Sequence, residues 1–174
     1  SNWNQTNLLY RNLGNSVFEI DPAGPINHIG DLPTVAQWGD FDNDGDLDLF
    51  VSVLYDPSVP QSLMFYENQG SNANANHKKI TEDYLNTLDV GNNSSPVLVD
   101  IDNDDDLDLF MGSLKNPTGS VIYLQNIGTK SEPAFHLIDT TYFNITGDLG
   151  VTPSFGDIDN DGDFDLLLGK FNGT

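Results

Sequence analysis

One Asp-rich segment occurs three times in this chain of 174 residues. The copies align without gaps and read GDFDNDGDLDLFV (39–51), VDIDNDDDLDLFM (99–111) and GDIDNDGDFDLLL (156–168). A second motif, which ends in Asn-x-Gly, also occurs three times, as LYRNLG (9–14), FYENQG (65–70) and YLQNIG (123–128). The two motifs alternate along the chain, and successive copies of the same motif lie 56 to 60 residues apart. Such a period indicates a repeat architecture.

Each repeat predicts four short β-strands and no helix. In the strand after the first Asp-rich segment, Leu49 and Val51 fall on one face and Phe50 on the other, by the two-residue alternation of a strand. Both faces are apolar, so we expect each sheet to pack on both sides, with Trp38 in the core. The expected strands are 34–38, 47–54, 63–67, 79–81, 96–99, 107–114, 121–125, 135–138, 152–155 and 164–171, with 17–20 after the first Asn-x-Gly motif.

Each Asp-rich segment contains a nine-residue loop with Asp at every odd position. Calcium takes about six to eight oxygen ligands, and such a loop supplies them from the side chains at positions 1, 3, 5 and 9 and the backbone carbonyl at position 7, with water. Magnesium fits less well because it demands octahedral geometry and retains its waters. We therefore expect about three calcium ions. The candidate metal residues are Asp40, Asp42, Asp44, Asp46, Asp48, Asp100, Asp102, Asp104, Asp106, Asp108, Asp157, Asp159, Asp161, Asp163 and Asp165.

The density of charge in these loops supports a bound cation. They hold five, six and five acidic residues, which is sixteen of the 27 in the chain, and each close carboxylate pair repels by ~1–4 kcal/mol. An EF-hand would need Glu at position 12, where this chain has Val51, Met111 or Leu168. A nonapeptide β-helix has a far shorter period. A solvated acidic turn is the remaining alternative, and three phased copies disfavour it.

The motif Asp-x-Asp-x-Asp-Gly-x-x-Asp between apolar strands, with a later Tyr-x-Asn-x-Gly, resembles the FG-GAP/VCBS repeat family, which includes the blades of the integrin α-subunit β-propeller. The resemblance covers nearly the whole chain and is closest to bacterial surface proteins with such repeats. It implies an all-β propeller of four-stranded antiparallel blades, a calcium ion in each loop, and extracellular or cell-surface adhesion. The chain departs from the pattern at Asp105, which replaces Gly, and at the polar segment 71–79, expected to be a flexible insertion. Asp105 predicts the weakest calcium affinity in the second loop.

The order of the motifs divides the chain into a half unit, two whole units and a half unit. Residues 1–33 would hold the third and fourth strands of a first blade and a connection. Residues 34–95 and 96–151 would be complete blades, and 152–174 the first two strands of a further blade. About three blade equivalents are fewer than the roughly four to eight that close a propeller. We therefore expect a larger propeller, completed by further blades of a parent chain or by another copy.

The charge balance excludes some partners. The formal net charge is −21, so a nucleic acid or an anionic membrane surface would be repelled. No apolar run is long enough to insert into a membrane. Aromatic residues make up 10% of the chain, which favours a folded protein over an acidic disordered one.

A ligand is expected on the face opposite the Asp loops, because the loops between strands alternate between the two faces of an up-and-down blade. That face would carry four aromatic residues suited to a protein or glycan ligand, namely Tyr55, Tyr84, Tyr142 and Phe143. The alternative is that these rings tuck against the blade edges. The sequence thus predicts a calcium-binding adhesion or ligand-recognition module. The competing hypothesis is the propeller portion of a polysaccharide lyase or hydrolase, but no motif joins His28, His77 or His136 to a nucleophile.

Overall fold

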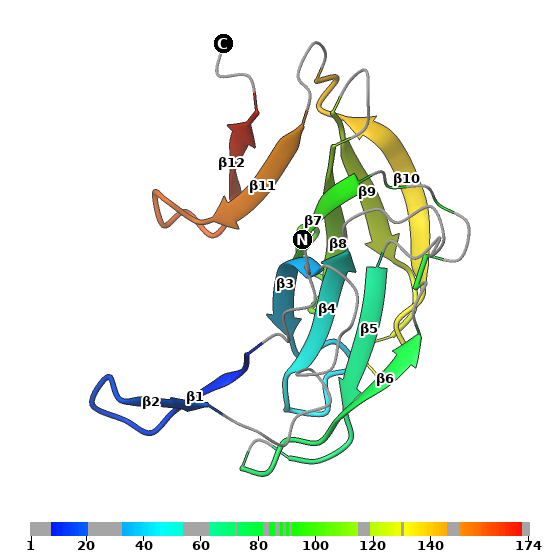
Figure 1. Cartoon of the computed structure of the whole chain (residues 1–174). Coiled ribbons are helices and arrows are strands. Elements are labelled where there is room, and N and C mark those ends of the chain that lie inside the picture. Colours follow the sequence, from blue (N-terminus) through cyan, green and yellow to red (C-terminus); the bar gives the residue numbers. More distant parts are fainter. Residues whose placement is uncertain are drawn as a thin grey trace.

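The structure is a computed structural model, and it describes residues 8–20, 33–53, 63–71, 73–81, 84–85, 88, 90, 92–114, 119–129, 131–145 and 150–171. These residues form β-strands joined by turns and loops (Figure 1). The described residues contain no helix of the length and apolar character that a membrane crossing requires. The strands are β1 (Tyr10–Asn12), β2 (Phe18–Ile20), β3 (Pro33–Gly39), β4 (Asp48–Val53), β5 (Leu63–Asn68), β6 (His77–Thr81), β7 (Asn92–Val99), β8 (Asp108–Leu114), β9 (Val121–Asn126), β10 (Phe135–Tyr142), β11 (Val151–Gly156) and β12 (Asp165–Lys170).

The strands form two four-stranded and two two-stranded antiparallel sheets. β3–β6 and β7–β10 each pair in sequence order, whereas β1 pairs with β2 and β11 with β12. We call the two four-stranded sheets the complete blades and the two hairpins the half-blades (Figure 1). The expected all-β fold of four-stranded propeller-type blades is confirmed.

The core lies between successive sheets. Phe50, Leu63 and Phe65 of the first complete blade pack in one cluster with residues of the second, among them Leu109 and Met111. Because strand residues alternate between faces, Phe110 points to the opposite face, where it packs with Tyr123 of its own sheet and Phe155 of β11. Burial of each such side chain contributes about 1.5–3 kcal/mol.

One glycine shows how closely successive sheets approach. A Cβ at Gly112 of β8 would lie 2.3 Å from the carbonyl oxygen of Val151 in β11. No real Cβ tolerates such a contact, so β8 and β11 pack this closely because residue 112 lacks a side chain.

The structure corrects two expectations. Trp38 is 37% exposed and meets His77 edge-on at 5.3 Å between ring centroids, so its expected place in the core is wrong. Leu98 and Phe155 occupy the same position in the later units, and each packs against the complete blade that precedes it. Trp38 instead follows the half-blade β1–β2, which explains why it is exposed. Segment 71–79 is no insertion, because Asn68 pairs with His77 across the same nine-residue separation as Asn126 with Phe135.

Candidate metal centres

The three Asp loops share one backbone conformation. The Asn at position 4 has a positive φ of 55° at Asn43, and the Gly at position 6 has one of 94° at Gly45. Asn and Gly adopt such angles more readily than other residues do. The corresponding values are 58° at Asn103, 71° at Asp105, 61° at Asn160 and 96° at Gly162. The Asn at position 4 was not singled out from the sequence, although its tolerance of left-handed backbone was the available signal.

Backbone N–H groups within each loop hold its carboxylates in place. In the first loop the N–H of Gly45 donates to Asp40 Oδ2 at 3.2 Å, and the N–H of Asp46 donates to Asp44 Oδ1 at 2.9 Å. Equivalent bonds run from Asp105 to Asp100, Asp106 to Asp104, Gly162 to Asp157 and Asp163 to Asp161. The Asp pattern therefore closes the turn as well as supplying charge.

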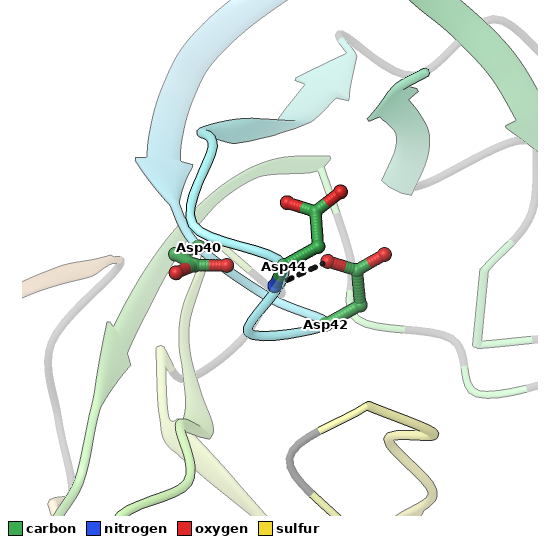
Figure 2. A group of neighbouring side chains, drawn as sticks. All are labelled: Asp40, Asp42 and Asp44. Atoms are coloured by element: carbon green, nitrogen blue, oxygen red, sulfur yellow. Dashed lines mark hydrogen bonds between the residues drawn. The ribbon is translucent and has the colours of Figure 1, made fainter. Parts of the chain in front are cut away.

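Each loop gathers three carboxylates into a group that could hold a metal ion. In the first loop, one oxygen from each of Asp40, Asp42 and Asp44 lies within 4.8 Å of the others. Figure 2 shows these side chains on one turn, with the Asp44 N–H donating to Asp42 Oδ1 at 3.2 Å. The other groups are Asp100 with Asp102 and Asp104, and Asp157 with Asp159 and Asp165.

Some carboxylate oxygens in the loops are buried without a hydrogen bond. Within the described part of the chain this holds for Asp40 Oδ1, Asp46 Oδ1 and Asp106 Oδ1. Burial, and next the negative charge of the Asp two residues earlier, raises the pKa of both Asp46 and Asp106. A buried carboxylate oxygen without a partner is costly, and a cation is the partner that such oxygens fit.

Position 9 joins the Asp loop to the third strand of its blade. Asp48 is 2% exposed, and its Oδ2 accepts the Phe41 N–H at 3.1 Å while its Oδ1 accepts the Asn68 N–H at 2.8 Å. Burial raises the pKa of Asp48 to about 6, against the lowering effect of these two bonds. Asp108 repeats the arrangement, accepting the Asn126 N–H at 2.7 Å, and burial raises its pKa to about 6 as well.

The Asn-x-Gly motif completes this link. The side-chain Oδ1 of Asn68 accepts the N–H groups of Gly70 at 3.1 Å and Asn76 at 2.8 Å. Asn126 accepts those of Gly128 and Ala134 in the same way. One Asn thus ties the turn between the third and fourth strands to the Asp loop. From the sequence the Asn-x-Gly motif was predicted to form only a turn, and its link to the Asp loop was missed. The regular alternation of the two motifs along the chain was the signal that could have indicated this link.

The third loop lacks this link in the described residues. Asp165 accepts the Ile158 N–H at 3.1 Å, but it is exposed and β12 pairs with β11 alone. Asp157, Asp159, Asp161 and Asp163 are exposed as well.

The aromatic residues considered as ligand contacts lie in different surroundings. Tyr84 packs with Phe50, at 5.1 Å between ring centroids, in the cluster between the complete blades, and burial raises its pKa to about 12. Tyr142 is half-buried against Tyr123, whereas Phe143 is 47% exposed with a φ of 70°. Tyr55 lies outside the described residues.

Of the three histidines, His77 lies beside the first Asp loop, where it acts to lower the pKa of Asp46 against the larger effect of burial. His77 is buried and its Nε2 lies 3.0 Å from the Leu47 carbonyl oxygen. His136 is exposed on β10, and His28 falls outside the described residues.

A cavity of about 430 Å³ has none of the clustered Asp residues in its described lining. Residues before β7 and residues of β9 and β10, with the turn between those two strands, line it. The described lining residues have mainly apolar side chains and are Tyr84, Leu85, Leu88, Leu124, Pro133, Ala134, Phe135 and Leu137. None of the described lining residues carries an acidic or basic side chain.

Comparison with known families finds a match over residues 100–168, which fit the model described as FG-GAP-like repeat. The matched segment begins at the first Asp of the second loop and ends within β12. It therefore spans two Asp loops and the strands between them. No curated protein sequence matches the chain significantly.

Proposed function

Because this chain contains FG-GAP-like repeats, we propose that each Asp loop binds one calcium ion and that the ions brace a ligand-recognition module. The buried carboxylate oxygens without hydrogen bonds, Asp40 Oδ1, Asp46 Oδ1 and Asp106 Oδ1, carry this proposal. A bound divalent ion supplies the positive charge that these groups lack. Calcium suits the loops better than magnesium, because they offer many carboxylate and carbonyl oxygens on one turn.

The residues that would hold the ion follow from the loop positions. In the first loop these are the carboxylates of Asp40, Asp42 and Asp44, which already lie together, with the backbone carbonyl of Asp46. Asp48 would add a carboxylate oxygen, as the position-9 residue Asp165 lies within the group of the third loop, while its two backbone bonds fix it to the blade. The ion would thus join a local turn to the body of the sheet.

Calorimetric titration tests the calcium sites. We expect about three calcium ions per chain and much weaker heats with magnesium. Replacing the first Asp of one loop, as in Asp40→Asn, Asp100→Asn or Asp157→Asn, should remove one ion each time. The absence of calcium heats in the folded protein, or a stoichiometry that none of these variants lowers, would contradict the proposal.

We also propose an extracellular or cell-surface location and a protein or glycan ligand on the face opposite the Asp loops. Calcium sites of extracellular modules bind at about 0.1–1 mM, which suits a structural ion there. Phe143 supports the ligand face, because its ring is exposed and its backbone is held in a left-handed conformation.

A glycan array and a pull-down of surface proteins test this face. The Phe143→Ala variant should lower binding about tenfold, whereas Ile127→Ala, an exposed apolar residue in the turn beside the Asp loops, should leave it unchanged. Equal binding by both variants would contradict the ligand face. Release of shortened glycans would instead favour a polysaccharide-degrading enzyme.

A further inference from the structure

The residue before the Asn of the Asn-x-Gly motif differs between the two complete blades. It is Glu67 near the end of β5 in the first blade and Gln125 near the end of β9 in the second. Both side chains are half-buried. Each comes directly before the Asn whose N–H donates to the position-9 Asp of its loop. The two residues therefore occupy the same place in their blades and differ in charge.

Strand pairing brings this place to the Asp loop in both blades. Leu49 pairs with Tyr66 in the first complete blade, and Leu109 pairs with Leu124 in the second. The next residue along each third strand therefore falls opposite the position-9 Asp, where the loop joins the second strand. A long side chain at this place is within reach of the loop carboxylates.

In the second complete blade this side chain contacts the loop directly. Gln125 Nε2 donates to Asp102 Oδ2 at 2.8 Å, although the two residues are 23 positions apart. Asp102 is at position 3 of the loop and belongs to its group of three carboxylates. One oxygen of that group therefore already has an N–H partner, which a cation would have to displace or share.

In the first complete blade the same place carries a negative charge. Burial, and next the charge of Asp44, raises the pKa of Asp42, and the charge of Glu67 raises it further. Glu67 acts on Asp42 more strongly than Asp40 does. Its Oε2 accepts Gln69 Nε2 at 2.5 Å, which holds the carboxylate on the strand. Carboxylates at such short range repel one another, and a cation relieves the repulsion.

A buried oxygen supports a cation in the first loop independently of the number of acidic residues. Asp46 is 7% exposed, and its Oδ1 has no hydrogen-bond partner in the part of the chain that the structure describes. A buried carboxylate oxygen of this kind requires a partner. Glu67 adds its charge to a loop that already lacks a positive one.

We propose that Glu67 is a further acidic group of the first calcium site and makes that site bind more tightly than the second. This inference rests on the proposed calcium binding and adds a residue from outside the nine-residue loop. Calcium affinity depends on the number of charged groups at the site and on its rigidity. Glu67 is not in the group of three carboxylates, so it acts on the ion through its charge or through a bridging water.

Exchange of the two side chains tests the proposal by calorimetric titration with calcium. The background Asp100→Asn/Asp157→Asn leaves the first loop as the single intact site, and Asp40→Asn/Asp157→Asn leaves the second. In the first background, Glu67→Gln should weaken calcium binding about tenfold, and in the second, Gln125→Glu should tighten it about fivefold. A gain of affinity cannot arise from a folding defect, and it leaves Asp105 in place.

Glu19→Gln in the first background is the matched control. It removes the same charge from an exposed position of β2, in a different sheet, and should change calcium affinity less than about twofold because salt screens such charges. Equal effects of Glu67→Gln and Glu19→Gln, or no gain from Gln125→Glu, would overturn the role of Glu67 while leaving calcium binding intact. Absence of calcium binding by both single-site backgrounds would instead overturn the proposed function, and this inference with it.

Discussion

The first and third Asp loops, 40–48 and 157–165, have nearly the same sequence and different surroundings. Their position-6 glycines have φ angles of 94° and 96°, and the same N–H groups close both turns. Asp48 is nevertheless 2% exposed, whereas Asp165 is exposed. The loop conformation is thus set locally by Asp, Asn and Gly. Burial of the loop is set by the third strand, which the complete blade contains and the half-blade lacks.

This difference separates two roles of the acidic residues. Asp at positions 1 and 5 closes the turn in every loop. Asp at position 9 links sheet strands in the complete blades alone, among the described residues. Removing the same residue type from a complete blade and from the half-blade should therefore have unequal effects.

Asp48→Ala should give the largest loss of stability. It leaves the N–H groups of Phe41 and Asn68 without their acceptor inside the blade, which should lower the free energy of unfolding by about 3 kcal/mol. Asp165→Ala removes the same candidate ligand but a single backbone bond at an exposed site, so its effect should be about 1 kcal/mol. Urea unfolding of both variants in calcium measures the difference, and equal losses would show that position 9 does not act as a link.

Tyr84 should give the contact between the complete blades a pH dependence. Its pKa is raised by burial from 10.0 to about 12, so the folded state favours the neutral phenol. The resulting stability is fully present below pH 10 and is lost as the pH rises to 12. The difference in stability between wild type and Tyr84→Phe should therefore shift by about 2 kcal/mol across this range. Urea unfolding at pH 9 and pH 11.5 measures it, and a constant difference would contradict the burial of the hydroxyl.

Asp105 should give the smallest effect. Its φ of 71° is a conformation that Gly adopts without strain, so Asp105→Gly should tighten calcium binding in the second loop about fivefold, or about 1 kcal/mol. Asp105→Asn removes the same charge but keeps the side chain, which separates strain from electrostatics. Calorimetry distinguishes the two, and weaker binding by Asp105→Gly than by Asp105→Asn would show that strain is not the limiting factor.

Local features of this fold could be predicted from the sequence, and contacts between blades could not. The alternation of Leu49, Phe50 and Val51 and the Asp-Gly pattern place the strands and loops close to their observed positions. The exposure of Trp38 and the packing of Tyr84 depend on which neighbouring sheet is present, which periodicity within one strand does not encode. The link from Asp48 to Asn68 joins residues twenty positions apart, and pairing of β4 with β5 is needed to bring them together.

Thermal unfolding with calcium and after chelation tests the role of the Asp loops most directly. Each site saturated at about 100 times its dissociation constant adds about 2.7 kcal/mol to the folded state. In a chain of this size 1 kcal/mol corresponds to about 2–4 °C in Tm. With three sites, chelation should lower Tm by about 15 °C or more, and calcium but not magnesium should restore it. An unchanged Tm after chelation would contradict the account that bound calcium braces these blades.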